Sequence, residues 1–361
     1  MVNVVLLFGG QSVEHDISCI THKQVVDAID SKKYQVKSVY LDKNNNFFIL
    51  KKEMTDIKNQ ISKCNLRKLK VKRKNKDLFF NNYKVDVVIN CIHGKGLEDG
   101  TISGFLDLLN VSYTSPSLES SIIFHNKFYA KLILNKYNIN TVDYEYVNKY
   151  QWNNNQNEVL RKLNRFNEVI VKPVNLGSSV GVILCNKKDL SDAIDSGFKY
   201  DAGVLIEKKL NKFLELNQAF YVVNGEIVIS KIEEVKNNST IYDFKDKYEN
   251  DDITRVVPAK LSNQLRSKIT KTTKKIGQIY NSKGVMRVDY LYDLESEILY
   301  VNEVNVIPGA LSFYLFEAKN IYFQTLIDDL IKEAKRSKIE NDNLIKQFNS
   351  NVLNKKNNKL K

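Results

Sequence analysis

The run Val2-Asn-Val-Val-Leu-Leu-Phe8, followed at once by Gly9-Gly10, decides the first part of the fold. All but one of its residues are apolar, which is typical of a strand buried on both faces, and the two glycines predict a tight turn at its carboxyl end. Because the stretch has neither a basic leader nor a long apolar core, we interpret it as a first strand and not as a signal peptide.

The segments that follow extend this pattern. Residues 18–29 have helical spacing, residues 34–41 alternate as a strand does, and residues 85–92 form another apolar run. This alternation predicts a parallel sheet with helices on its faces. Ligands bind beyond the carboxyl ends of the strands in such sheets. The loops 9–15 and 93–100 are therefore candidate site loops.

The rest of the chain divides into two further units and a polar tail. The second unit begins near Pro116, and the tail begins after about Lys338. We expect helices over residues 126–137, 262–281 and 323–335. We expect strands over residues 144–147, 168–173, 180–185, 204–208, 284–292 and 297–303, and a hairpin over 216–233 that turns at Asn224-Gly225.

The composition excludes several classes of protein. Hydrophobic residues make up 43 % of the 361 residues, so the chain is not intrinsically disordered. We find no run of about 18 apolar residues, the length that a membrane span requires. The four cysteines (Cys19, Cys64, Cys91 and Cys185) and the four histidines lack the spacing of a disulfide framework or a zinc site. We therefore expect a reducing, cytoplasmic location and no membrane partner.

The net charge of +13 raises the alternative of a nucleic-acid-binding protein. Most of this charge lies in two segments: residues 51–77 carry +8 and residues 332–361 carry +6, so the remainder is nearly neutral. Both segments are rich in Asn and Lys, and neither contains a recognisable nucleic-acid-binding motif. We interpret them as a solvated surface patch and a polar tail, with a basic nucleic-acid-binding protein as the competing hypothesis.

Lys172 stands at the end of an apolar strand and is followed by the turn Gly177-Ser178-Ser179-Val180-Gly181. The backbone N–H groups of such a turn can cradle phosphate oxygens, while the lysine supplies a point charge. The pattern is not a Walker P-loop. Taken alone, it is more typical of a structural hairpin.

Two further segments, Met286-Arg287-Val288-Asp289 and Asn302-Glu303-Val304-Asn305, combine strand alternation with carboxylates. Alternation puts Arg287 and Asp289 on one face and Glu303 and Asn305 on one face. If the two strands pair, Asp289, Glu303 and Asn305 form an oxygen-rich cluster, which suits Mg²⁺ or Mn²⁺ with bound phosphates. The alternative is a solvent-exposed polar face with a salt bridge.

Taken together and in order, six segments resemble motifs of the D-alanine–D-alanine ligases, which belong to the ATP-grasp superfamily. The resemblance covers residues 2–335 approximately and is carried by residues 8–18, 93–101, 172–181, 242–248, 287–289 and 302–309. It implies an α/β protein in which an ATP-grasp fold is preceded by a parallel-sheet N-terminal domain. The implied units are an N-terminal substrate domain (1–115), a central ATP-grasp subdomain (116–208), a C-terminal ATP-grasp subdomain with the metal site (209–338) and a polar basic tail (339–361).

The resemblance also implies roles for single residues on the amino-acid side of the site. Glu14 would hold the ammonium of the first amino acid, with Ser178 and Tyr248 hydrogen-bonded to it. Arg287 and the N–H of Gly309 would stabilise the oxyanion. The remaining implied substrate residues are His93 and Ser312.

On the nucleotide side, the resemblance implies that the ATP phosphates bind to Lys127, Lys172 and Lys247. Glu207 and Glu215 would contact adenine and ribose, next to the backbone of Lys208 and Leu210. Ser179 and Asn302 complete the implied nucleotide set, and Asp289, Glu303 and Asn305 would hold two Mg²⁺ or Mn²⁺ ions.

The implied activity is the ATP-dependent joining of two D-alanines through an acyl phosphate, which supplies peptidoglycan precursors. ATP activates the poorly electrophilic carboxylate, and the acyl phosphate must be kept from water. We therefore expect residues 237–252 to form a lid. The resemblance further implies a homodimer that acts on small D-amino acids and does not bind nucleic acid.

The sequence departs from the family pattern at residues 309–317, which are several residues shorter than in typical members. Ser312 is the candidate substitute for the serine that seats the second substrate's carboxylate, and Val306-Ile307 replace small polar residues. These changes leave a ligase with another acceptor, such as D-serine, D-lactate or another amine, as an alternative.

Overall fold

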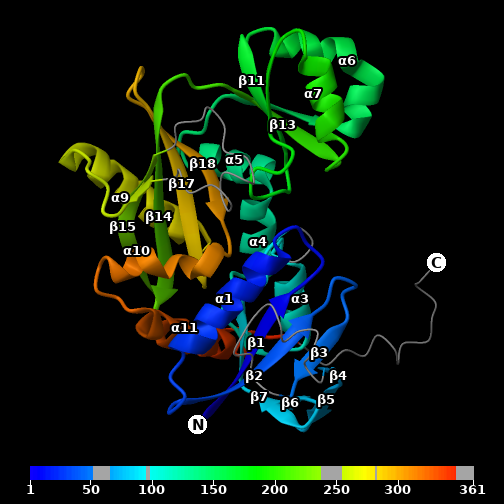
Figure 1. Cartoon of the computed structure of the whole chain (residues 1–361), viewed down its shortest axis with the longest axis vertical. Helices are drawn as coiled ribbons and strands as arrows, with labels where there is room; N and C mark the ends of the chain where they lie inside the picture. Colours follow the sequence, from blue (N-terminus) through cyan, green and yellow to red (C-terminus); the bar gives the residue numbers. More distant parts are fainter. Residues whose placement is uncertain (52–65, 95–97, 237–253, 281–282, 347–361) are drawn as a thin grey trace, which may run out of the picture.

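The structure is a computed structural model that describes residues 1–51, 66–94, 98–236, 254–280 and 283–346. Its strands form three larger sheets and a small one (Figure 1). The N-terminal sheet, drawn in blue, lies in the lower part of the view, the four-stranded sheet at the top and the five-stranded sheet on the left. The mixture of parallel and antiparallel sheets with helices confirms the predicted α/β class.

The N-terminal sheet has the strand order β4-β3-β2-β1-β8-β9. Its strands are β1 (Val2–Gly9), β2 (Tyr34–Leu41), β3 (Phe47–Leu50), β4 (Leu66–Lys68), β8 (Val87–Asn90) and β9 (Ser112–Tyr113). Strand β1 runs parallel to β2 and β8, and β8 runs parallel to β9, so the predicted parallel sheet is confirmed for these four strands. Strands β3 and β4 extend it in antiparallel fashion, since only a short connection separates β3 from β2.

Strand β1 is buried on both faces, as its apolar run predicts. Val4, Leu6 and Phe8 belong to one hydrophobic core, and Val5 and Leu7 belong to the other. Helix α1 (His15–Ala28) contributes Cys19 and Val25 to the first core, while α3 (Thr101–Leu108) contributes Ile102 and Leu106 to the second. Helices therefore cover both faces of the sheet.

The single strand expected over residues 85–92 is divided in two. Strand β7 (Tyr83–Val85) belongs to a small sheet with β5 (Val71–Lys74) and β6 (Asp77–Phe80), whereas β8 belongs to the main sheet. The break falls at Asp86, whose backbone N–H donates to Asn3 O at 3.0 Å and whose Oδ2 accepts from Asn3 N–H at 2.9 Å. Strand β5, in the basic segment 51–77, is exposed along its whole length.

The central sheet is antiparallel, with the order β10-β13-β11-β12. Its strands are β10 (Tyr144–Asn148), β11 (Glu168–Pro173), β12 (Ile183–Asn186) and β13 (Gly203–Lys208). Helices α6 (Lys149–Leu163) and α7 (Leu190–Gly197), which the sequence analysis did not predict, pack against it. Asn148 and Gln151 begin α6 with a reciprocal capping box, with hydrogen bonds of 2.8 and 3.2 Å.

The C-terminal sheet has five antiparallel strands in the order β16-β15-β14-β17-β18. They are β14 (Phe213–Val223), β15 (Glu226–Lys236), β16 (Thr254–Val256), β17 (Val285–Asp293) and β18 (Leu299–Asn305). The predicted hairpin turn is confirmed: Asn224 and Gly225 both have positive φ, 53° and 79°, as a type I′ turn requires. Helix α9 (Asn263–Tyr280) packs on β14 and β15.

The remaining helices join the sheets to one another. Helices α4 (Leu118–His125) and α5 (Lys127–Lys136) contact β18, and the short turn η1 (Gly309–Ser312) contacts α1. After α10 (Phe313–Glu317), helix α11 (Phe323–Asp342) touches α1, β8, β9 and β14, and it runs beyond its predicted end at Lys335. The loops that follow β1 and β8 thereby come to face the C-terminal sheet.

Two further expectations concern cysteines and membranes. Cys19, Cys91 and Cys185 are buried free thiols, whereas Cys64 lies outside the described residues. Of the helices in the described ranges, none has the length and apolar character that crossing a membrane requires.

Candidate functional site

A cavity of about 320 Å³ lies where the N-terminal loops meet one face of the C-terminal sheet. Glu14 and His93 reach it from the loops after β1 and β8, and Ser178 reaches it from the glycine-serine turn. The other predicted site residues in its wall come from the sheet and the segment after it: Glu215, Arg287, Asp289, Glu303, Asn305 and Gly309. The fold thus brings residues from five of the six sequence motifs to one cavity.

Four polar residues stand in register across four strands of this sheet. Glu303 on β18 is opposite Asp289 on β17, which is opposite Asn217 on β14, which in turn is opposite Glu233 on β15. Side chains in register on neighbouring strands lie on the same face of a sheet. The pairing of β17 with β18, which the oxygen-rich cluster required, is therefore present.

Asp289 is surrounded by donors. Arg287 Nε donates to Oδ1 at 2.7 Å, Arg287 Nη2 donates to Oδ2 at 2.8 Å, and Asn305 Nδ2 donates to Oδ2 at 2.9 Å. Burial lowers the pKa of Arg287, but the Asp289 carboxylate raises it well above its ordinary value. Arg287 therefore remains a fixed positive charge beside the cluster.

The oxygen donors in this cluster suit a hard cation. Asp289, Glu303 and Asn305 offer two carboxylates and an amide oxygen, the ligand types of Mg²⁺ and Mn²⁺. Within the described ranges, no group of three or more His, Cys, Asp or Glu side chains is placed to hold a metal ion by itself. An ion at this cluster would therefore complete its shell with water and with the oxygens of a bound phosphate.

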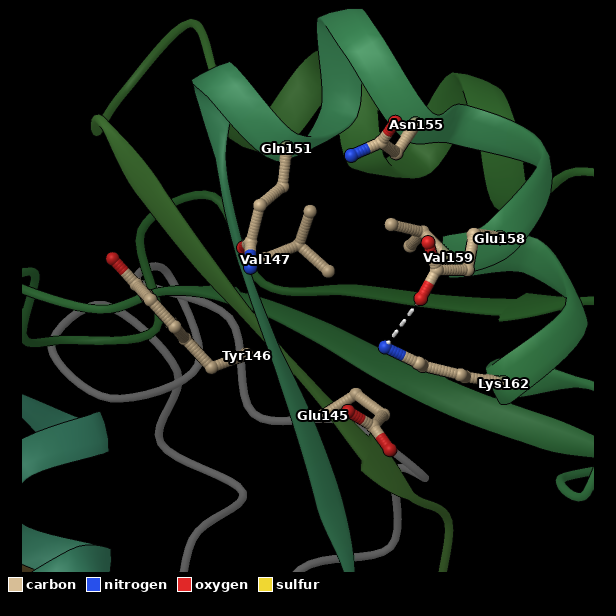
Figure 2. Close-up of a pocket in the computed structure, with 8 residues that line it drawn as sticks. All are labelled: Glu145, Tyr146, Val147, Gln151, Asn155, Glu158, Val159 and Lys162. Carbon is tan, nitrogen blue, oxygen red and sulfur yellow. Dashed lines mark ion pairs between the residues drawn. The ribbon is translucent and has the colours of Figure 1, made fainter.

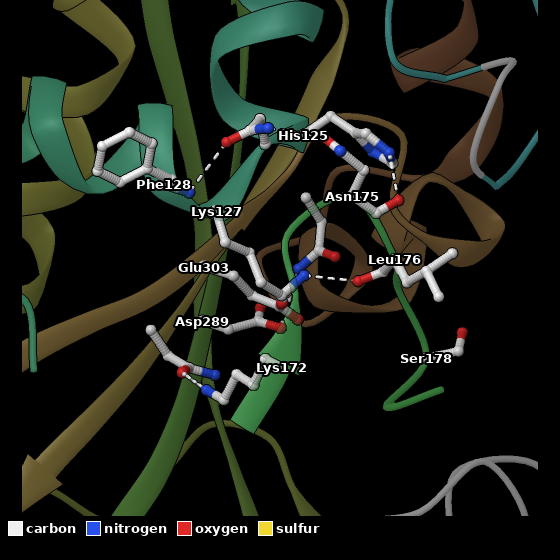
Figure 3. Close-up of polar contacts among 12 residues, drawn as sticks. His125, Lys127, Phe128, Lys172, Asn175, Leu176, Ser178, Asp289 and Glu303 are labelled. Atoms are coloured by element: carbon white, nitrogen blue, oxygen red, sulfur yellow. Dashed lines mark hydrogen bonds and ion pairs between the residues drawn. The ribbon is translucent and has the colours of Figure 1, made fainter. Parts of the chain in front are cut away.

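Lys127 brings a positive charge to the same cluster. It is the first residue of α5, which Asn126 caps by accepting from the N–H groups of Phe128 and Tyr129 at 3.1 and 3.0 Å. Lys127 Nζ lies 3.3 Å from Glu303 Oε2 and donates to Leu176 O at 2.6 Å (Figure 3). The helix N-terminus and the ammonium together favour an anion at this point.

Glu207 is a buried carboxylate held between two lysines. Lys172 Nζ lies 2.6 Å from its Oε2, and Lys131 Nζ lies 3.0 Å from its Oε1. Burial by itself raises the pKa of Glu207, but the two ammonium groups hold it at about 2. Lys172 also donates to Asn302 Oδ1 at 3.1 Å, which joins three of the predicted nucleotide residues into one connected set.

Lys131 was missed by the sequence analysis. It is 1 % exposed and lies four residues after Lys127 on α5. The i, i+4 spacing places both lysines on one face of the helix, and this spacing is the signal that could have identified it.

The glycine-serine turn brings the central sheet to Glu14. Ser178 Oγ donates a short hydrogen bond to Glu14 Oε1, and both residues are 8 % exposed. Ser178 and Ser179 have positive φ values of 53° and 58°, an unusual conformation for two successive residues with side chains. Such backbone strain is characteristic of functional sites.

His93 connects the cavity to the segment after β18. It is 3 % exposed, and burial lowers its pKa, so its imidazole is neutral at neutral pH. Its Nε2 lies 2.9 Å from Thr21 Oγ1, which accepts from Ala310 N–H at 3.1 Å.

Glu98 also lines the cavity, and the sequence analysis gave it no individual role. His125, whose Nδ1 lies 3.5 Å from Glu98 Oε1, was likewise missed. Burial lowers the pKa of His125, but the hydrogen bond to Glu98 and the charge of that carboxylate raise it above its ordinary value.

Ser312 is not brought to the cavity wall. It is 0 % exposed, and its Oγ is buried with no hydrogen-bond partner among the described residues. Ala310, Leu311 and Ser312 have φ values of 53°, 50° and 48°, and this left-handed turn carries the chain into the core. Tyr314, two residues later, lines the cavity instead.

Of the predicted nucleotide residues in the described ranges, only Glu215 lines this cavity, and the others lie away from its wall: Lys127, Lys172, Ser179, Glu207, Lys208, Leu210 and Asn302. Lys208 N–H donates to Asp143 O at 2.9 Å, and Leu210 is 9 % exposed. Lys247, Tyr248 and the rest of the expected lid over residues 237–252 lie outside the described residues.

A second hollow of about 100 Å³ lies between β10 and α6 (Figure 2). None of the predicted site residues lines it, and its charged pair, Glu158 and Lys162 at 2.9 Å, is an exposed i, i+4 pair on α6. Exposed pairs of this kind contribute little energy and are common on helices. The 320 Å³ cavity is therefore the candidate active site.

Comparisons with known proteins give a consistent result. The family model for the D-ala D-ala ligase N-terminus matches residues 3–116, and the model for the D-ala D-ala ligase C-terminus matches residues 133–332. A D-alanine–D-alanine ligase of Thermosipho africanus is 34 % identical, with 94 % of this chain and 96 % of the relative covered. One of Clostridium acetobutylicum is 33 % identical, covering 92 % and 97 %.

Solved structures agree in fold. The structure of the D-alanine–D-alanine ligase from Coxiella burnetii superposes with a TM-score of 0.83 and covers 94 % of this chain and 96 % of that one. At 24 % sequence identity, this likeness establishes the shared fold.

Proposed function

The chain belongs to the D-alanine–D-alanine ligase family of ATP-dependent enzymes that form a peptide bond, and from this premise we propose that it joins two D-alanines at the 320 Å³ cavity. This assignment is supported by one observation: Glu14 and the paired residues Asp289 and Glu303 line the same cavity. An ammonium site and a phosphate-and-metal site must lie side by side if an amino acid is to be phosphorylated on its carboxylate.

In the first step, the carboxylate of one D-alanine attacks the γ-phosphorus of ATP, ADP leaves, and an acyl phosphate forms. Glu14, oriented by Ser178, holds the ammonium of this amino acid and so directs its carboxylate toward the phosphate. Lys127 and Lys172 bind the phosphates, next to the carboxylates that now hold them. Asp289, Glu303 and Asn305 would hold Mg²⁺, which when bound would supply positive charge for the phosphoryl transfer.

In the second step, the amine of the other D-alanine attacks the acyl carbon. A tetrahedral oxyanion forms, phosphate leaves, and the proton of the amine passes to the departing phosphate. Arg287 and the N–H of Gly309 are the donors available to this oxyanion, and both line the cavity. Donors fixed in advance stabilise an oxyanion without reorganisation. The roles proposed for Lys247 in binding phosphate and for Tyr248 in the lid rest on the sequence resemblance alone.

The acceptor site is where the structure departs from the expected residues. Ser312, the predicted carboxylate ligand, is buried away from the cavity. This observation favours a second candidate, a ligase of the same family that joins D-alanine to D-serine, D-lactate or another amine. The choice between these acceptors is decided by measurement.

The wider context is also part of the proposal. We propose a cytoplasmic homodimer that supplies peptidoglycan precursors and has no nucleic-acid or membrane partner, divided into domains at residues 1–115, 116–208 and 209–338 with a tail over 339–361. The division is supported by the sheets, since most of each domain's strands belong to one sheet. The buried free thiols of Cys19, Cys91 and Cys185 suit a reducing compartment.

The direct test supplies purified protein with ATP, Mg²⁺ and D-alanine, then with D-alanine plus D-serine or D-lactate. We expect D-alanyl-D-alanine, ADP and phosphate in equal amounts. Formation of AMP and pyrophosphate, or no D-alanyl product with any acceptor, would overturn it. A preferred product with D-serine or D-lactate would select the second candidate.

A further inference from the structure

We propose that Arg255, held in place by Glu233, is the side chain that receives the carboxylate of the second amino acid. The inference rests on the proposed function and adds a substrate-binding group to it. Neither Arg255 nor Glu233 belongs to the sequence motifs that carry the family resemblance.

The second amino acid must place a carboxylate in a cavity that is already rich in negative charge. Glu14, Glu98, Glu215, Asp289 and Glu303 all line it. With Ser312 buried in the core, the expected hydroxyl partner for this carboxylate is missing from the wall. A carboxylate among other carboxylates requires a cation close to it, because a buried charge without a partner is strongly unfavourable.

Arg255 is one of only two positive charges in the described wall of the cavity. The other is Arg287, since His93 is neutral at neutral pH. Arg287 donates from Nε and Nη2 to the two oxygens of Asp289, so the paired edge that could hold a second carboxylate is already engaged and only its remaining N–H donors are left for the oxyanion. Arg255 is therefore the guanidinium that remains for a substrate carboxylate.

The sheet register places Arg255 on the face that forms the cavity. Arg255 on β16 is opposite Val235 on β15, and Val235 lines the same cavity. Val235 and Glu233 are two residues apart on one strand, so their side chains share a face. Arg255 thus extends the polar row Glu303-Asp289-Asn217-Glu233 toward the edge of the sheet.

Glu233 fixes one edge of the guanidinium. Its side chain is 0 % exposed, and Arg255 Nη1 donates to its Oε1 at 3.2 Å. Its other oxygen, Oε2, accepts from Asn217 Nδ2 at 2.9 Å and from Tyr314 O–H at 3.1 Å. This carboxylate is therefore held at both oxygens and in turn orients Arg255.

Among the described residues, nothing else binds the rest of the guanidinium. Within the described ranges, Glu233 is the one hydrogen-bond partner of Arg255, whose side chain is 43 % exposed. Arginine carries five N–H donors in a planar fork that matches a carboxylate with two parallel hydrogen bonds. The donors that Glu233 leaves unused can bind such a group.

Arg255 recognises the carboxylate of the acceptor and not its attacking group. D-alanine, D-serine and D-lactate all carry a carboxylate, so Arg255 does not discriminate among them. It discriminates against an acceptor whose carboxylate is replaced by a neutral amide, such as D-alaninamide. The identity of the attacking amine or hydroxyl is thus set elsewhere in the site.

The test separates the two amino-acid sites. Rates measured over a wide range of D-alanine concentration give the KM of the acceptor step. Positional isotope exchange in ATP labelled at the β,γ-bridge reports the first step, because it requires only the first amino acid. The variants are Arg255→Gln, Arg255→Lys and, as a matched control, Arg266→Gln on the exposed surface of α9. Thermal unfolding of each variant checks that it is folded.

For Arg255→Gln we expect the acceptor KM to rise by about 10- to 100-fold, the range for losing a hydrogen-bonded charged group, with unchanged isotope exchange. Arg255→Lys, which keeps the charge but not the fork, should lie between this variant and the parent. The preference for D-alanine over D-alaninamide should shrink in Arg255→Gln. The control should match the parent in every measurement.

An unchanged acceptor KM in folded Arg255→Gln would overturn the inference, and so would equal losses in isotope exchange and acceptor binding, because these would place Arg255 at the first site or in the fold. If Arg255→Gln does not fold, Arg255→Lys and the D-alaninamide comparison decide in its place. Failure of the proposed function is distinct: the parent would then form no D-alanyl product at all.

Discussion

Asp289 and Glu303 lie directly opposite each other on the antiparallel strands β17 and β18, with their side chains on one face of the sheet. Each has a positive neighbour, because Arg287 pairs with Asp289 at 2.7 Å and Lys127 pairs with Glu303 at 3.3 Å. Two adjacent carboxylates, each beside a positive charge, are an arrangement that suits a phosphate-bound Mg²⁺.

Glu303→Gln should abolish turnover while leaving the fold intact. The substitution keeps the shape of the side chain but removes the charge that a metal ion needs, and we expect kcat to fall by about 100-fold or more. The measurement is kcat at several Mg²⁺ concentrations, with Glu295→Gln in the exposed turn between β17 and β18 as the control. Near-normal turnover at ordinary Mg²⁺ would contradict the metal assignment.

Lys131→Met should destabilise the protein and weaken ATP binding. It leaves Glu207 with Lys172 alone, and when ATP phosphates attract Lys172 the buried carboxylate loses its remaining partner. Because Lys172 still pairs with Glu207, we expect the free energy of unfolding to fall by less than the about 3–5 kcal/mol that an unpaired buried charge costs. Urea unfolding and the KM for ATP report the two effects, with exposed Lys136→Met on the same helix as the control.

The double variant Lys131→Met/Glu207→Gln sharpens this prediction. Because it removes the charge that Lys131 balances, it should recover part of the stability lost in the single variant. A single variant as stable as the parent would mean that Lys131 is not the permanent counter-charge of Glu207.

The stability of the protein should depend on pH through Glu207. Its pKa falls from the ordinary 4.5 to about 2 in the folded protein, so its ion pairs stabilise the fold fully above about 4.5. That contribution is lost as the pH falls through the folded value. Urea unfolding of the parent and of Glu207→Gln between neutral pH and pH near 3 measures it. The two should converge on acidification, and curves that stay parallel would contradict the assigned charge.

Tyr248→Phe should reduce dipeptide formation and increase futile ATP hydrolysis. The sequence resemblance matches Tyr248 to the lid tyrosine expected to accompany dipeptide formation. Without its phenol we expect poorer closure and greater access of water to the acyl phosphate. The measurement is phosphate released per peptide bond with D-alanine and with D-lactate as acceptors. A parent that prefers D-lactate at neutral pH would show that the short 309–317 segment, not the lid, sets the acceptor.

The sequence was sufficient where local pattern determines structure. Apolar runs and alternation predicted β1, β2 and β11, and Asn224-Gly225 predicted its hairpin, because each is specified within a few residues. Alternation also placed Asp289 and Arg287 on one face. It could not supply the register between β17 and β18, since a slip by one residue would move every side chain of one strand to the opposite face.

Other features were missed for identifiable reasons. Helix α6 buries only Trp152 and Leu163, so its Asn- and Gln-rich sequence shows little apolar periodicity; the Asn148–Gln151 capping box was its one local signal. The meeting of Glu233 with Arg255 depends on pairing between β15 and β16. Ser312 looked suitable by its position after Pro308-Gly309, but three successive left-handed residues turn it inward. Long-range pairing and unusual backbone angles leave no periodic trace in a sequence.

The measurement that tests the central claim most directly follows an oxygen atom. D-alanine carrying ¹⁸O in its carboxylate is incubated with the protein, ATP and Mg²⁺, and the released phosphate is analysed by mass. If the carboxylate attacks the γ-phosphorus and phosphate later leaves from the acyl carbon, each dipeptide formed transfers one ¹⁸O into one phosphate. Dipeptide formation with unlabelled phosphate, or with label in AMP, would contradict the acyl-phosphate mechanism and with it the roles assigned to Glu14, Asp289 and Glu303.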